Sequence, residues 1–264
     1  MAMSTMYQTV KLIKDGPVAR VSFCRPEIHN AFNDTLIYEL TDLFTALKAD
    51  ASLRVVVLTG EGKSFCAGAD LNWMRRVKDY SFEKNLEEAQ ALANLFWLIY
   101  SLPLPVVGRI NGAAIGGGTG FVAVCDIAVA AESAKFSFSE VKIGVVPACI
   151  GPYVIRKIGE GKAREFFISG ERLSAADAFR IGLVNRWYPD DRLDEEVGGL
   201  IKTILSSGPH AIKMAKELIA NVPLMTPEQF KPYTAEMIAR LRKSDEGQEG
   251  MDAFLNKRKP NWVT

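Results

Sequence analysis

The chain is poor in the residues that hold metal ions. Its 264 residues include four cysteines and two histidines, with no C-x-x-C pair. These are Cys24, Cys66, Cys125 and Cys149, with His29 and His210. A structural zinc site needs clustered ligands, so no metal is expected. Isolated cysteines act as small apolar side chains, and four unpaired thiols favour a reducing cytoplasm.

Net charge and long apolar runs are also lacking. The formal net charge is +1, which argues against nucleic acid as a partner, because phosphate binding needs a concentrated basic face. No run approaches the roughly 18 apolar residues that span a bilayer, and the first sixteen residues contain no apolar signal core. With 48% hydrophobic residues, the chain can form one large domain or two modest ones.

Strands and helices alternate along the first half of the chain. The alternation around Asp15-Gly16 predicts a hairpin, and the β-branched run Arg54–Thr59 predicts a strand buried on both faces. Apolar residues at helical spacing predict a helix over 33–49. The second half reads mainly as helices. We therefore expect an α/β core over residues 1–200 and a helical region over 201–264.

Two glycine-rich segments follow predicted buried strands: Gly60–Asp70 and Asn111–Gly120. Glycine and alanine at a strand-to-helix turn leave backbone N–H groups unshielded, and a helix N-terminus adds partial positive charge. Two such turns facing each other could each donate to one carbonyl oxygen as it gains negative charge. The sequence therefore predicts an oxyanion-binding site.

Two nucleotide-binding interpretations are weaker. The turn over 60–64 resembles a phosphate-binding loop, but that motif needs glycine where the chain has Val57. The segment 118–123 matches G-x-G-x-x-A, with Glu132 placed as a ribose-binding acid, which would indicate a nicotinamide-dependent oxidoreductase. However, this match lies mid-chain and does not follow its strand directly.

Motifs in the same order along nearly the whole chain resemble the enoyl-CoA hydratase/isomerase (crotonase) superfamily. They are Arg25-Pro26, Ser64–Leu71, Asn111–Gly118, Cys125–Ile127, Ser139-Glu140 and Glu249–Met251. The resemblance implies a crotonase-like spiral of β-β-α turns that binds an acyl-CoA thioester. It also implies a C-terminal helical region that mediates trimers, often paired into hexamers, and no cofactor apart from the coenzyme A of the substrate.

The resemblance assigns roles to individual residues. The amides of Ala69 and Gly117 correspond to the family's oxyanion hole, and Glu140 corresponds to a catalytic glutamate that moves the α-proton. Residues expected to contact coenzyme A or the acyl group are Arg25, Ile28, Ala67, Gly68, Asp70, Leu71, Trp73 and Gly116. A helix-start glutamate and a plain surface arginine are the structural alternatives for Glu140 and Arg25.

The chain departs from the family at Gly120, where hydratases usually carry a second glutamate. One acid remains, as in the Δ3,Δ2-enoyl-CoA isomerases. The sequences of segments 66–74, 139–148 and 150–153 resemble those of a bacterial branch of the family assigned to 3-methylglutaconyl-CoA hydratase. That branch also has a small residue at the position of Gly120. We therefore expect a lyase for a branched enoyl-CoA. The alternatives are an isomerase, a general enoyl-CoA hydratase, and an acyl-CoA-binding scaffold without activity.

Overall fold

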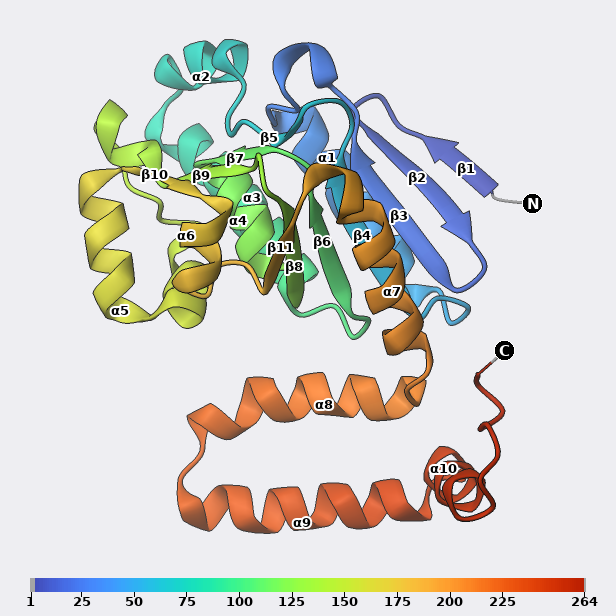
Figure 1. Cartoon of the computed structure of the whole chain (residues 1–264). Coiled ribbons are helices and arrows are strands. Elements are labelled where there is room, and N and C mark those ends of the chain that lie inside the picture. Colours follow the sequence, from blue (N-terminus) through green and yellow to red (C-terminus); the bar gives the residue numbers. More distant parts are fainter. Residues whose placement is uncertain (1–2, 264) are drawn as a thin grey trace.

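A seven-stranded sheet runs through the centre of the computed structural model, which describes residues 3–263 (Figure 1). In spatial order its strands are β1 (Met3–Met6), β2 (Val10–Asp15), β3 (Val18–Phe23), β4 (Val55–Gly60), β6 (Val106–Ile110), β8 (Ile127–Ala131) and β11 (Arg186–Tyr188). The first three pair antiparallel, and the others continue the sheet in parallel. The hairpin and the buried strand predicted from sequence are confirmed.

The strands of a second, four-stranded sheet were not predicted individually from the residue pattern. Its order is β10 (Arg172–Ser174), β9 (Lys135–Ser137), β7 (Ala113–Ile115) and β5 (Ser64–Cys66). Each strand has three residues, too few for an alternating pattern to be recognised. Strands β5, β7 and β9 each follow a strand of the large sheet, and a helical segment comes next. This repeat is the spiral of β-β-α turns, so the fold-class prediction is confirmed.

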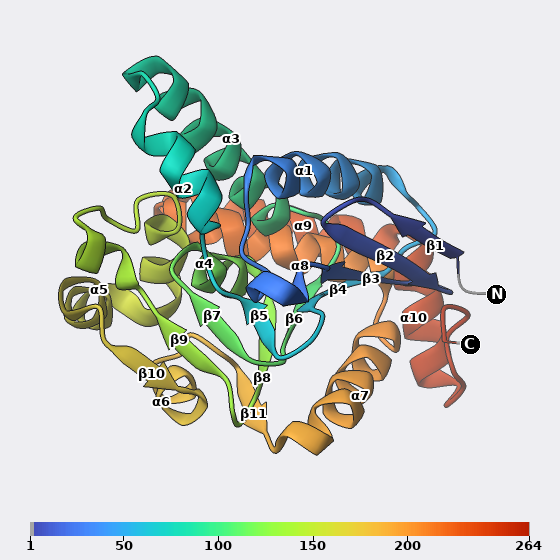
Figure 2. The same cartoon turned by 90° about the horizontal axis from the view of Figure 1, so that it is seen from above.

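Helices cover both faces of the large sheet (Figure 2). They are α1 (Asp34–Ala49), α2 (Leu71–Lys78), α3 (Phe82–Tyr100), α4 (Gly117–Val124), α5 (Gly151–Ser169), α6 (Ala175–Arg180) and α7 (Leu193–Leu205). Short 3-10 helices lie at Pro26–Ile28, Ser139–Ile143, Asp190–Arg192 and Val222–Leu224. In β4, Val56 and Leu58 face the main core, whereas Val55 and Val57 face α7, as strand geometry requires.

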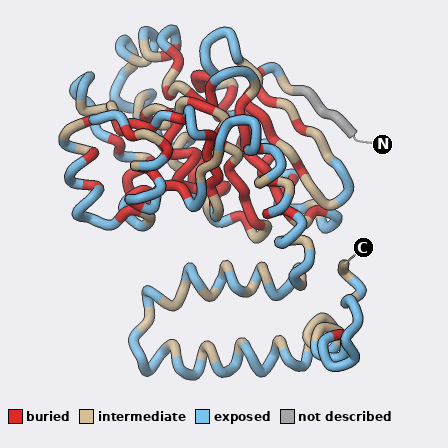
Figure 3. The backbone as a smooth tube through the Cα atoms, viewed as in Figure 1, coloured by how far each residue is buried: buried red, intermediate tan, exposed pale blue. Residues whose placement is uncertain are grey.

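Three further helices form a separate layer beside the core (Figure 1). They are α8 (Pro209–Asn221), α9 (Pro227–Lys243) and α10 (Asp245–Leu255). Figure 3 shows that this layer is mostly exposed, in contrast to the buried strands. It is attached to the core where Lys216 Nζ meets Asp126 Oδ2 at 2.6 Å and where Arg54 Nη1 donates to the Trp262 carbonyl at 2.9 Å. The chain therefore leaves the core after α7, at Leu205.

Two asparagines fix the turn between β4 and β5. Asn30, fully buried, donates through Nδ2 to the carbonyls of Glu61 and Ser64, at 2.8 and 2.7 Å. Asn111 Nδ2 donates to the Gly62 carbonyl at 2.9 Å. The Gly60 amide in turn donates to Asn111 Oδ1 at 3.2 Å. Side chains from two other segments of the chain therefore hold the carbonyl groups of this turn in place.

Replacing Asn30 by Ala should destabilise the fold by about 3 kcal/mol, because the buried carbonyls lose their donor. Alanine must also adopt the positive φ of 57° found at this position. Urea unfolding measures the change. As a control, Asn94→Ala on the exposed side of α3 should stay within about 0.5 kcal/mol of wild type. An Asn30→Ala protein as stable as wild type would contradict this account.

Candidate active site

Two backbone segments meet at the predicted oxyanion site. A Cβ built on Gly118, in the first turn of α4, would lie 2.0 Å from the Cys66 carbonyl oxygen. One built on Gly68, which has φ +93°, would lie 2.8 Å from the Ile115 oxygen. Only glycine permits such contact between two main chains. The segment after β5 therefore lies directly against the start of α4.

This contact leaves two amides available. Phe32 N donates to the Gly68 carbonyl, and Asp70 N donates to the Phe32 carbonyl, both at 2.8 Å. In a parallel bridge of this kind, the amide of the residue between, Ala69, points to the opposite side. Gly117 is the first residue of α4, so its amide has no partner within the helix. Within residues 3–263, no group accepts a hydrogen bond from either amide.

Glu140 lies beside these amides. It belongs to the 3-10 helix Ser139–Ile143, and its Oε1 would be 3.2 Å from a Cβ on Gly116, the residue before Gly117. Its other carboxylate oxygen, Oε2, is buried without a hydrogen-bond partner in the described structure. Burial raises the pKa of Glu140, and a hydrogen bond from its own amide only partly offsets this. The carboxyl group therefore keeps its proton to a higher pH than an exposed glutamate does.

The space at position 120 is already filled. A Cβ on Gly120 would lie 2.1 Å from Ile150 Cγ2 and 3.0 Å from Phe96 Cζ. Both neighbours are buried aliphatic or aromatic side chains. The packing of Ile150 and Phe96 therefore leaves no room for a carboxylate side chain at position 120. The contact of Ile150 and Phe96 with position 120 also requires glycine there. This second glycine of the G-x-G-x-x-A match is therefore explained by packing rather than by a bound dinucleotide.

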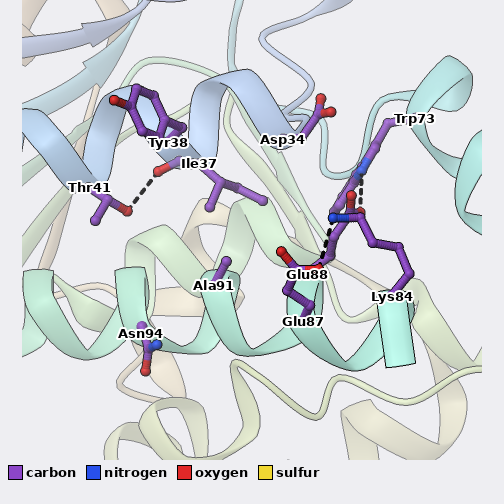
Figure 4. Close-up of a pocket in the computed structure, with 10 residues that line it drawn as sticks. All are labelled: Asp34, Ile37, Tyr38, Thr41, Trp73, Lys84, Glu87, Glu88, Ala91 and Asn94. Carbon is purple, nitrogen blue, oxygen red and sulfur yellow. Dashed lines mark hydrogen bonds and ion pairs between the residues drawn. The ribbon is translucent and has the colours of Figure 1, made fainter. Parts of the chain in front are cut away.

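The Phe32 ring lies between Trp73 and Gly117. The Phe32 ring would be 2.7 Å from a Cβ on Gly117, and the rings of Phe32 and Trp73 have centroids 5.7 Å apart. Trp73 Nε1 donates to Glu88 Oε2 at 2.8 Å. On its outer side Trp73 borders a cavity of about 440 Å³ between α1 and α3 (Figure 4). Its other lining residues are Asp34, Ile37, Tyr38, Thr41, Lys84, Glu87, Glu88, Ala91 and Asn94.

Arg25 and Asp70 brace the segment that carries Ala69. Arg25 Nη2 meets Asp70 Oδ2 at 2.7 Å, and its Nη1 donates to the Ala31 carbonyl at the same distance. Burial alone would raise the pKa of Asp70, but hydrogen bonds from the Asn72 amide and from Arg25 outweigh it and lower the pKa. Asp70 also caps α2. A contact from Arg25 to coenzyme A stays a prediction.

The structure gives the other predicted binding residues different environments. Ala67 donates its amide to the His29 carbonyl at 3.0 Å, while Ile28 and Leu71 are exposed. His29 Nδ1 is 3.0 Å from Ser64 Oγ, so this ring nitrogen has a hydrogen-bond partner within the protein. Among residues 3–263, no cluster of His, Cys, Asp or Glu is arranged to hold a metal. No helix in the same range has the length and hydrophobicity of a membrane span.

Comparison with known proteins shows the family of this chain. The model of the family described as enoyl-CoA hydratase/isomerase matches residues 14–264. The chain belongs to this family. It is therefore an enoyl-CoA hydratase-type enzyme, a lyase.

Individual relatives extend over nearly the whole chain. Crotonyl-CoA hydratase of Syntrophomonas wolfei is 33% identical over 98% of this chain and 99% of its own. The crystal structure of an enoyl-CoA hydratase from Shewanella pealeana superposes with a TM-score of 0.93 at 36% identity, covering 97% of this chain and 96% of that one. The structure of Pseudomonas aeruginosa AtuE superposes with a TM-score of 0.94 at 31% identity, covering 97% of this chain and 100% of that one.

Sequence reasoning missed the residues around Gly120 and Gly117. Ile150, Phe96 and Phe32 come from three separate segments of the chain. Apolar residues of this kind read as ordinary core positions. Their contacts with the two glycines are long-range, so no local pattern could have indicated them.

The raised pKa of Glu140 makes a prediction about stability. Because the folded state binds this proton more tightly than the unfolded chain, ionisation of Glu140 lowers stability as the pH rises above its ordinary pKa of 4.5. Glu140→Gln should therefore unfold at a higher temperature than wild type at pH 8, and the difference should shrink towards pH 4. Thermal unfolding at both pH values measures this. Exposed Glu171→Gln is the control; an equal pH-dependent gain there would refute the assignment.

Proposed function

We propose that this enzyme reversibly hydrates a branched enoyl-CoA, 3-methylglutaconyl-CoA, to 3-hydroxy-3-methylglutaryl-CoA. The observation that carries the proposal is the Glu140 carboxylate beside Gly116, next to the available amides of Ala69 and Gly117. One acid and two donors are the minimum set for making and protonating an enolate.

In the proposed mechanism, the thioester oxygen accepts hydrogen bonds from Ala69 N and Gly117 N. These donors stabilise the negative charge that develops on the oxygen, each by about 3 kcal/mol. Glu140 takes a proton from water as the water oxygen bonds to C3, and a proton from the same carboxyl group then bonds to C2. Water is added across the double bond, and Glu140 returns to its initial state.

The acyl group is proposed from the similarity of 66–74, 139–148 and 150–153 to the 3-methylglutaconyl-CoA hydratase branch. Two arginines on α2 support a substrate with a distal carboxylate, because guanidinium binds carboxylate bidentately. Arg75 and Arg76 follow Trp73 after one intervening residue, Met74, and both are exposed. Arg76 now pairs with Asp34 at 2.8 Å, a bond that a substrate carboxylate would have to replace.

The Δ3,Δ2-enoyl-CoA isomerase is the second candidate. Moving a double bond requires one group that removes a proton and returns it, and Gly120 leaves Glu140 as the acid at this site. A general enoyl-CoA hydratase would use the same groups on an unbranched chain. The products formed from 2-enoyl and 3-enoyl substrates separate these possibilities.

Purified enzyme should convert 3-methylglutaconyl-CoA faster than crotonyl-CoA and should form a 3-hydroxyacyl product, as measured by chromatography with mass detection. Glu140→Gln should lower kcat by about 1,000-fold or more, because the proton carrier is lost. Its affinity for coenzyme A, measured by calorimetry, should stay within about 2-fold of wild type.

Glu132→Gln, a change of the same type outside the site, is the matched control and should retain wild-type kcat. Retained hydration in Glu140→Gln would refute the mechanism. If the enzyme only converts a 3-enoyl-CoA to its 2-enoyl isomer, the hydratase assignment is refuted and the isomerase assignment takes its place.

We also propose that the cytoplasmic enzyme assembles as a trimer or hexamer through its C-terminal helices. Large apolar side chains are exposed on this layer, a feature typical of subunit interfaces. They are Ile219, Leu224, Ile238, Met251, Phe254 and Leu255. Light scattering should give three or six times the 29.1 kDa chain mass. Ile219→Asp with Ile238→Asp should lower that mass, and a monomeric wild type would contradict the proposal.

A further inference from the structure

Glu140 and Ile150, from two other segments, both lie against one face of α4. Gly116 and Gly120 are four residues apart, and Gly120 N donates to the Gly116 carbonyl at 3.3 Å, so they share this face. The Glu140 carboxylate lies over Gly116, whereas the Ile150 side chain lies over Gly120. The separation along the helix is one turn, about 5–6 Å.

Ile150 is held firmly in this position. It precedes α5, and its carbonyl accepts the amides of Tyr153 and Val154 at 3.1 Å. Its side chain is 2% exposed. Phe96, the other neighbour of Gly120, packs on Phe121 with a centroid distance of 4.9 Å. These two side chains therefore have little freedom to move away from an incoming group.

The geometry of a bound thioester determines which part of the acyl group is directed towards Ile150. An oxygen bound at Gly117 N places the carbonyl carbon at the first turn of α4, and the α-carbon must face Glu140 for proton transfer. The β-carbon and its substituents then extend by a few ångströms, which is the distance from Gly116 to Gly120 along the helix. A β-substituent that extends along the helix from Glu140 is therefore directed towards Ile150.

We propose that Ile150 is a specificity-determining residue that limits the size of the β-substituent. The class of substrate it admits is a 3-methyl-branched enoyl thioester, and larger 3-alkyl groups meet its side chain. Gly120 is the necessary partner, because any side chain there would occupy the volume that Ile150 already fills. The inference rests on the proposed acyl-CoA site. It adds the residue that limits how large a β-substituent this site accepts.

The steric pairing is tested first, without substrate. Gly120→Ala should lower the unfolding midpoint by about 5 °C or more, because overpacked methyl groups are destabilising. Gly161→Ala, the same change in a helical position with nothing within 4 Å, should have no such effect. In Gly120→Ala with Ile150→Ala, the loss should be smaller than the sum of the two single losses. Additive losses would overturn the pairing.

Selectivity is tested with 2-enoyl-CoA thioesters that carry methyl, ethyl or propyl at C3. Ile150→Ala should raise kcat/KM for the propyl ester relative to the methyl ester by about 10-fold or more. Ile158→Ala removes the same atoms from another buried position of α5 and should leave the ratio unchanged. An unchanged ratio in folded Ile150→Ala, or an equal shift in Ile158→Ala, would overturn the inference.

Binding separates this inference from the proposed reaction. Affinities of the saturated 3-alkyl esters are measured by calorimetry in Glu140→Gln, with and without Ile150→Ala, where no turnover is needed. If wild type hydrates none of the substrates but Ile150→Ala still shifts these affinities towards propyl, the reaction is refuted and the role of Ile150 stands. If hydration occurs and the affinities do not shift, the role of Ile150 is refuted.

Discussion

The close contact between two main chains at the start of α4 is the constraint on which the site depends. Gly118 lies against the Cys66 carbonyl and Gly68 against the Ile115 carbonyl, so two segments from different turns of the spiral meet without side chains between them. The available amides of Ala69 and Gly117 are a consequence of this contact. A methyl group at either glycine would push the segments apart and separate the two donors.

Glu140 and the apolar side chains over Gly120 both lie against the start of α4. Ile150 and Phe96 over Gly120 leave no room for a second carboxylate, and burial leaves one oxygen of Glu140 without a partner. This arrangement destabilises the ionised carboxylate in the fold and raises its pKa. The same feature that reduces stability at neutral pH suits the group to carry a proton.

Much of the fold could be predicted because its long elements have strong local patterns. The β-branched run of β4 and the capped, amphipathic α1 form where sequence periodicity placed them. The small sheet could not be predicted, since β5, β7, β9 and β10 have three residues each. Their stability comes from neighbours in the sheet rather than from their own residues.

The sequence by itself determined the family, the two glycine-rich turns and the single acid, because these depend on residue types in a fixed order. It also indicated the loss of a carboxylate at Gly120. Only the tertiary structure decided what takes its place and what Arg25 and Trp73 contact. Ile150, Phe96 and Phe32 reach the site from separate elements, and side-chain packing between distant segments leaves no periodic signal in the chain.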